Sequence, residues 1–185
     1  MGRVVAYVII PGIDGSDEQH WQTVWERQRS GSAVRISPTS WSEPDLDDWV
    51  GAVQAAYDQA SRHDSQVVLV AHSLGCWAAS TWLNRNTSRP TGSAFLVAPP
   101  DPRGPAFPRQ TAPTFAEVSA QPLLTPTLVV GSSNDAYCTP EAAVDLTTRW
   151  GARWHLAGAV GHINSAAGLG PWQQGRELLT SLTSQ

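Results

Sequence analysis

The sequence predicts a three-layer α/β/α sandwich built on a sheet of about six mostly parallel strands. Short apolar runs alternate along the chain with segments of helical periodicity. The runs are apolar on successive residues, which is typical of parallel strands that helices cover on both faces. The expected strands are Val4–Ile10, Ala33–Ile36, Val67–Ala71, Ala94–Ala98, Thr127–Val130 and, more weakly, Arg153–Leu156.

Helix start signals lie between these strands. Ser16 and Gln19 form a capping-box pattern, Asp45 is a good N-cap residue, and Pro140 suits a first helical turn. A helix should also follow the third strand directly. The other expected helices are Ser16–Arg29, one capped by Asp45 that reaches Ala60, Pro140–Arg149 and Pro171–Leu182.

A proline-rich segment interrupts the alternation after the fourth strand. Six prolines lie between positions 99 and 113, and proline cannot donate a backbone hydrogen bond to a helix or sheet. We expect Pro99–Pro126 to run over one end of the sheet as a long surface excursion, with no cap domain. A chain of 185 residues is predicted to form a single domain, residues 1–185.

The composition excludes several classes of function. The chain has 12 basic and 16 acidic residues, and neither sign gathers in a block, so neither nucleic acid nor a membrane surface is an expected partner. All basic residues are arginine, which excludes Schiff-base chemistry. Cys76 and Cys138 are too few for a disulfide framework and lack metal-ligand spacing. We expect a cytoplasmic protein without metal or cofactor.

The third strand ends in a sequence that predicts a nucleophile. Ala71 and Gly75 stand two residues before and two residues after Ser73, which is the spacing of a nucleophile elbow. A turn sharp enough to lift a serine above the sheet crowds these two positions, so only small residues fit. The same turn aims the N–H of Leu74 at a substrate oxyanion. The simpler alternative is that Ser73 only caps the following helix.

A serine nucleophile needs a base, and the base needs a carboxylate. His162 follows the sixth predicted strand and Asp135 follows the fifth, so both should reach the same sheet edge as Ser73. The chain order serine, aspartate, histidine is that of the α/β-hydrolases. Asp101, after the fourth strand, is an alternative acid that we favour less than Asp135.

The turn after the first strand, PGIDG, should complete the oxyanion hole. Its donor is predicted to be the N–H of Ile13, with Asp14 as the less favoured choice. Residues that could support the site or line its pocket are Asp14, His20, His72, Trp41 and Trp77. We expect His72 to orient backbone or line the site, His20 to hydrogen-bond behind the loop, and the two tryptophans to shape an acyl pocket.

Four segments carry a resemblance to a known family: PGIDGSDEQHWQTVW, VAHSLG, GSSNDAYC and GHINSAAGLGPW. They resemble the small serine hydrolases of the retinoblastoma-binding protein nine and YdeN-like family, which are minimal α/β-hydrolases with little or no cap. The resemblance covers nearly the whole chain, and the paired His-Trp after the first loop is its most specific mark. It implies Ser73 as nucleophile, Asp135 as acid and His162 as base.

The sequence therefore predicts a serine hydrolase that acts on small, short-acyl carboxylic esters through an acyl-enzyme. Two alternatives remain open. The same triad could serve an amidase or acyltransferase, and a hydrolase fold could serve binding or regulation with little turnover. The natural substrate, the oligomeric state and any protein partner are not determined by the sequence.

Overall fold

The computed structural model describes residues 5–63 and 66–184. Six strands form one sheet in the order β2-β1-β3-β4-β5-β6, and every neighbouring pair is parallel. The predicted strands are confirmed, except that Val4 lies outside the described residues. The strands are β1 Val5–Ile10, β2 Ala33–Arg35, β3 Gln66–His72, β4 Thr91–Val97, β5 Thr127–Gly131 and β6 Arg153–Leu156.

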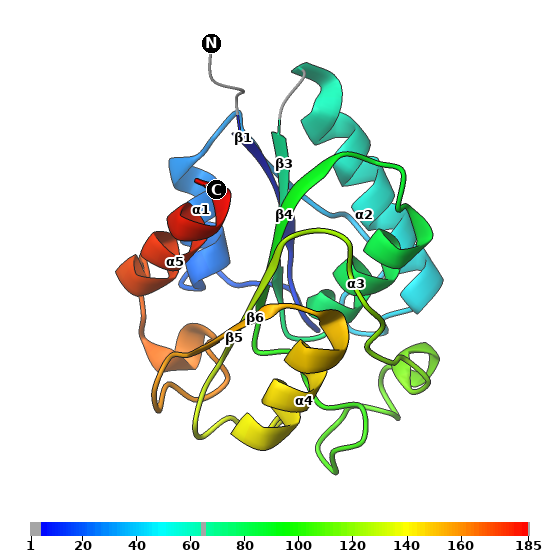
Figure 1. Ribbon diagram of the computed structural model, residues 1–185, viewed down its shortest axis with the longest axis vertical. Coiled ribbons are helices and arrows are strands. Elements are labelled where there is room, and N and C mark those ends of the chain that lie inside the picture. Colours follow the sequence, from blue (N-terminus) through cyan, green and yellow to red (C-terminus); the bar gives the residue numbers. More distant parts are fainter. Residues whose placement is uncertain (1–4, 64–65, 185) are drawn as a thin grey trace.

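Helices cover both faces of this sheet, which confirms the predicted three-layer sandwich. Helices α2, α3 and α4 pack on one face, and α1 and α5 pack on the other (Figure 1). No helix in the described part of the chain is long and apolar enough to cross a membrane. The helices are α1 Trp21–Gln28, α2 Leu46–Ala60, α3 Gly75–Arg85, α4 Pro140–Trp150 and α5 Gln173–Thr183.

Successive residues of a strand place their side chains alternately in two separate hydrophobic cores, which explains the continuous apolar runs. In β1, Val8 and Ile10 pack beneath α2 and α3, while Ile9 between them packs beneath α1 and α5. In β3, Leu69 and Val70 divide in the same way, and both are fully buried. Because side chains alternate between the faces of a strand, a sheet covered twice needs apolar residues at every position.

Helix α1 starts later than the capping-box pattern predicts. Its N-cap is His20, whose Nδ1 accepts the N–H of Gln22 at 3.2 Å. The predicted start at Ser16 is wrong because Asp17 accepts the N–H groups of Gln19 and His20 and holds them in a turn. The Ser16 hydroxyl instead donates to the side chain of Gln22 at 2.7 Å.

The segment between β4 and β5 is irregular, as predicted. Its one regular element is a short 3-10 helix, Pro113–Phe115. Phe115 and Ala112 are fully buried and hold the segment against the α2 side of the core. Prolines from this segment therefore reach the carboxyl edge of the sheet without forming a separate cap.

The order in which strands are added to the sheet reverses at β1, so a switch point lies between the carboxyl ends of β1 and β3. The chain passes from β1 to β2 on one side and then returns to β3 on the other side of β1. Ligands of parallel α/β sheets bind in the crevice at such a switch point. The fully buried side chain of Gln22 bridges the two strands on either side of this point: its amide donates to the carbonyls of Ile10 and Val70 at 3.2 and 3.0 Å.

Gly75 lies where α3 meets the end of β1. A Cβ atom at this position would lie 2.4 Å from the carbonyl oxygens of both Ile10 and Pro11, which are backbone atoms that cannot move aside easily. The small residue two positions after Ser73 is therefore required by packing between a helix start and a strand end.

We expect Gly75→Ala to lower the free energy of unfolding by about 1–3 kcal/mol, because the added methyl group overpacks this contact. Gly51→Ala in α2 is the matched control, since a Cβ there meets no atom within 4 Å. It should raise the free energy of unfolding by about 0.5–1 kcal/mol, because alanine favours the helix. Urea unfolding measures both, and equal stability of Gly75→Ala and wild type would contradict the packing argument.

Candidate active site

Ser73 stands on a strained turn between β3 and α3. Its φ of 54° lies in the left-handed region, which costs free energy for a residue with a side chain. The turn is held by the Ser73 N–H, which donates to the Val97 carbonyl at 2.9 Å. On its other side, a Cβ atom on Gly12 would lie 2.8 Å from the Ser73 Cβ. Glycine at position 12 therefore lets the first loop lie directly against the serine.

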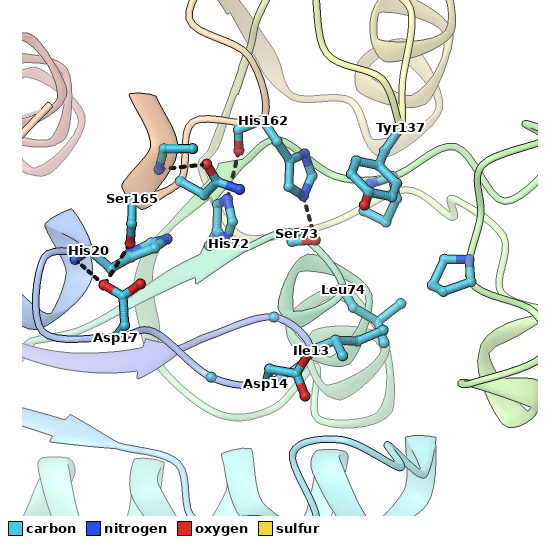
Figure 2. A pocket seen from close by; sticks show the side chains of 16 residues that line it. Ile13, Asp14, Asp17, His20, His72, Ser73, Leu74, Tyr137, His162 and Ser165 are labelled. Carbon is cyan, nitrogen blue, oxygen red and sulfur yellow. Dashed lines mark hydrogen bonds between the residues drawn. The ribbon is translucent and has the colours of Figure 1, made fainter. Parts of the chain in front are cut away.

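Three side chains form a continuous hydrogen-bonded chain at this turn. His162 Nε2 lies 2.8 Å from Ser73 Oγ (Figure 2). On the other side of the ring, His162 Nδ1 lies 2.9 Å from Asp135 Oδ2. The Asp135 side chain is only 2% exposed, and its Oδ1 also accepts the N–H of Tyr137. Because Nδ1 donates to the carboxylate, Nε2 presents its lone pair to the serine hydroxyl and can take its proton.

Asp101 lies away from this chain. Its Oδ1 accepts the N–H of Arg103 at 2.9 Å, and its own N–H donates to the carbonyl of Tyr137. Neither interaction involves His162. The geometry therefore favours Asp135 over Asp101 as the partner of the imidazole.

Two backbone N–H groups beside Ser73 are free to bind a ligand. Ile13 and Leu74 both line the cavity, and neither N–H donates to any residue in the described ranges. The N–H of Asp14 instead donates to the Trp41 carbonyl at 3.0 Å. Ile13 and Leu74 therefore retain the free backbone donors that an oxyanion hole requires, and Asp14 does not.

A cavity of about 460 Å³ opens around Ser73. Trp41 and Trp77 do not line it, so the acyl pocket predicted from these two residues is wrong. Trp77 is fully buried and donates its indole N–H to Pro100. Trp41 packs behind Gly15. The residues lining the cavity are Gly12, Ile13, Asp14, Gly15, Asp17, His20, His72, Ser73, Leu74, Pro100, Pro108, Tyr137, His162, Asn164, Ser165 and Ala166.

His72 and Trp21 hold the loop that carries His162. His72 Nε2 donates to the carbonyl of His162 at 2.9 Å, and the Trp21 indole donates to the carbonyl of Ile163 at 2.8 Å. Burial lowers the pKa of His72 well below its usual value, so the ring is neutral near pH 7. His72 thus orients backbone, as the sequence suggested, and also lines the cavity.

Side chains after β5 hold the same loop from its other end. Asn134 Oδ1 accepts the N–H of Gly161 at 2.7 Å, and Ser132 Oγ accepts the N–H of Val160 at 3.0 Å. These residues belong to the segment GSSND, which also supplies Asp135. The sequence motif therefore contains both the carboxylate and the anchors of the loop that faces it.

His20 forms part of the cavity lining, although the residue is only 3% exposed. Its ring packs edge-on against His72 with centroids 4.7 Å apart. Burial lowers its pKa to about 4, so His20 is neutral at pH 7. Its Nε2 has no hydrogen-bond partner within the described residues, and no group of three or more His, Cys, Asp or Glu side chains there could hold a metal ion.

Three lining residues had no sequence signal. Asp17 accepts a hydrogen bond from the Ser165 hydroxyl at 2.7 Å, although 148 positions separate them in the chain. Tyr137 places its ring 4.5 Å from the ring of His162, centroid to centroid. Asp17, Tyr137 and Ser165 lie inside the segments PGIDGSDEQHWQTVW, GSSNDAYC and GHINSAAGLGPW, but no local pattern marks any of the three as a site residue.

Neither metal ligands nor reactive thiols gather at this site. Within residues 5–63 and 66–184, no three His, Cys, Asp or Glu side chains lie close enough together to hold a metal ion. Cys76 and Cys138 are free and buried. Burial raises the pKa of both thiols, to about 12 for Cys138, so both stay protonated near neutral pH.

The sequence matches the serine hydrolase family over residues 7–181. A protein described as a YdeN-like hydrolase from Pectobacterium atrosepticum is 31% identical, with a TM-score of 0.83 over 98% of this chain and 91% of the other. The ydeN gene product of Bacillus subtilis is 22% identical, with a TM-score of 0.70 over 98% and 100% of the two chains.

A more distant fold relative is Est1E from Butyrivibrio proteoclasticus with ferulic acid bound. It is 12% identical, with a TM-score of 0.77 over 99% of this chain and 91% of that one. At this identity the likeness concerns the fold alone. A comparison with curated proteins found no match.

The buried neutral state of His20 predicts a loss of stability in acid. The folded pKa of about 4 lies below the ordinary value of 6.5, so the unfolded chain binds the proton more readily. The contribution of neutral His20 to the free energy of unfolding is complete above pH 6.5 and disappears as the pH falls toward 4. Between pH 7 and 5 the free energy of unfolding should fall by about 2 kcal/mol more in wild type than in His20→Asn.

Asparagine is a good N-cap residue, so His20→Asn should preserve the start of α1. Urea unfolding at the two pH values measures the difference. If the free energy of unfolding falls by the same amount between pH 7 and 5 in wild type and His20→Asn, His20 does not cause the loss of stability in acid.

Proposed function

Given that the chain belongs to the serine hydrolase family, as a YdeN-like member of the α/β-hydrolase superfamily, we propose that it hydrolyses small, short-acyl carboxylic esters. The observation that carries the proposal is the 2.8 Å contact between Ser73 Oγ and His162 Nε2. It is supported by the buried Asp135 on the other ring nitrogen. Together they form the arrangement that activates a serine hydroxyl.

In the acylation step, His162 Nε2 takes the hydroxyl proton as Ser73 Oγ attacks the ester carbonyl. The carbonyl oxygen becomes an oxyanion, which would accept hydrogen bonds from the free N–H groups of Ile13 and Leu74. His162 then gives its proton to the leaving alcohol. Asp135 holds the imidazole in the required tautomer and stabilises its positive charge while the proton is held.

Deacylation repeats these steps with water. A water molecule gives a proton to His162 Nε2 and attacks the acyl carbonyl, and the proton returns to Ser73 as the carboxylic acid leaves. The neutral state of His72 favours this cycle, because a second positive ring beside His162 would oppose its protonation.

The cavity favours small substrates. Its volume of about 460 Å³ lies toward the lower end of the roughly 300–1,000 Å³ usual for ligand pockets. Two of its walls come from the irregular segment, at Pro100 and Pro108, and no cap closes over them. A short acyl group and a small alcohol fit such a space better than a long chain.

The nucleophile is tested with a fluorophosphonate probe. Wild type should label covalently and Ser73→Ala should not, because only an activated serine attacks the probe. Mass spectrometry of the labelled peptide identifies the site. Equal labelling of the two proteins would remove Ser73 from the mechanism.

The acid is tested by Asp135→Asn, with Asp101→Asn as the matched control. Asp135→Asn should lower kcat for p-nitrophenyl butyrate by roughly 10⁴-fold, since the amide favours the wrong imidazole tautomer. Asp101→Asn should retain activity close to wild type. The reverse order of the two rates would transfer the role of acid to Asp101.

A further inference from the structure

The cavity has two chemically different sides. Figure 2 shows Asp17, His20 and Ser165 to the left of Ser73, and Tyr137 to its right. His162 lies above the serine in this view, and Ile13 and Leu74 lie below it. An ester carbonyl bound between Ser73 and the free N–H groups would therefore send its acyl and alcohol groups toward opposite sides.

The left side ends in an accessible carboxylate. Asp17 Oδ1 accepts hydrogen bonds from Ser165 and from the N–H groups of Gln19 and His20. Its Oδ2 has no partner among the described residues. The hydrogen bond from Ser165 and the two backbone bonds lower the pKa of Asp17, so the carboxylate is charged at neutral pH.

No positive side chain balances this charge. Asp14 is a second carboxylate in the cavity lining, and among the described residues that line it there is no arginine. His20 and His72 are neutral at pH 7 because burial lowers their pKa values. An anionic substrate group would therefore meet uncompensated negative charge, while a hydroxyl or ammonium group could donate to Asp17 Oδ2.

The right side presents apolar surface. Tyr137 is 40% exposed, and Pro100 and Pro108 line the cavity with it. The backbone of Tyr137 is fixed on both sides: its N–H donates to Asp135, and its carbonyl accepts the N–H of Asp101. The exposed ring offers a surface against which an apolar group can pack.

We propose, resting on the proposed ester hydrolysis, that the substrate joins an apolar group to a group that carries hydroxyl or ammonium donors. The apolar group packs on Tyr137, Pro100 and Pro108. The donor group hydrogen-bonds to Asp17. Esters with an anionic group on that side are poor substrates.

Two matched substrate series test this, one for each orientation of the ester. In the first, S-(2-dimethylammonioethyl) thiobutyrate, which carries one N–H donor, is compared with its neutral isostere S-(3-methylbutyl) thiobutyrate. S-(3-hydroxypropyl) thiobutyrate is compared with S-butyl thiobutyrate, and 3-(butyrylthio)propanoate is the anionic member. In the second, the p-nitrophenyl ester of β-alanine is compared with p-nitrophenyl butyrate, so that an ammonium group replaces a methyl group.

In one of the series, kcat/KM should be about threefold to tenfold higher for the donor-bearing ester than for its neutral isostere, as expected for a charged hydrogen bond at a partly exposed site. The anionic thioester should be the slowest of its series. The cationic preference should shrink at high salt, and the hydroxyl preference should not. No preference in either series would overturn the inference.

Asp17→Asn should bring the kcat/KM ratio of the ammonium ester to its neutral isostere down to about one, because the amide NH2 that replaces Oδ2 cannot accept a hydrogen bond. The amide oxygen can still accept the hydrogen bonds that Asp17 Oδ1 accepts, so the loop should stay in place. Glu18→Gln is the matched control: it removes the same charge one residue away, on a side chain that is 88% exposed and does not line the cavity. It should change neither rate.

Equal loss of activity of Asp17→Asn toward donor-bearing and neutral esters would assign Asp17 a structural role and overturn the inference. Fluorophosphonate labelling and hydrolysis of p-nitrophenyl acetate report the proposed function separately. If both are normal and no preference appears, only the substrate inference fails. If wild type neither labels nor hydrolyses any ester, both proposals fail.

Discussion

The left-handed turn at Ser73 is the constraint on which the rest of the site depends. A φ of 54° on a residue with a side chain persists only when its surroundings hold it. Here Gly12 lies against the serine on one side, and Gly75 lets α3 start against the carbonyls of Ile10 and Pro11 on the other. The same close approach brings the first loop, with the N–H of Ile13, within reach of a ligand at Ser73.

His162 is positioned by side-chain hydrogen bonds to the backbone of its loop. Its loop contains no long regular element, so side chains replace the backbone hydrogen bonds that a helix or strand would provide. His72 and Trp21 hold the carbonyls of residues 162 and 163, while Ser132 and Asn134 hold the N–H groups of residues 160 and 161. Four donors and acceptors from three parts of the chain therefore fix the backbone on which the imidazole stands.

The sequence predicted the strands, most helices and the order of Ser73, Asp135 and His162, because these follow from local patterns. Buried parallel strands are apolar at every position, and an elbow needs small residues at fixed spacing. The start of α1 at His20 was missed because Asp17 competes for the N–H groups that the capping box at Ser16 would use. The contact between Asp17 and Ser165 was not predicted, since 148 residues separate them and no local pattern links the two segments that contain them.

The bond from the Trp21 indole to the carbonyl of Ile163 joins positions 142 residues apart. This bond joins α1 to the loop of His162 in the last quarter of the chain. The amide of the next residue, Gln22, joins α1 to β1 and β3. Contacts of such separation cost more conformational entropy to form than local contacts do, because the loops that they close are long. The reactive geometry at Ser73 thus arises only when both ends of the chain have docked. A covalent serine probe would therefore count completely folded molecules, where a spectroscopic signal from the helices would also include partly assembled ones.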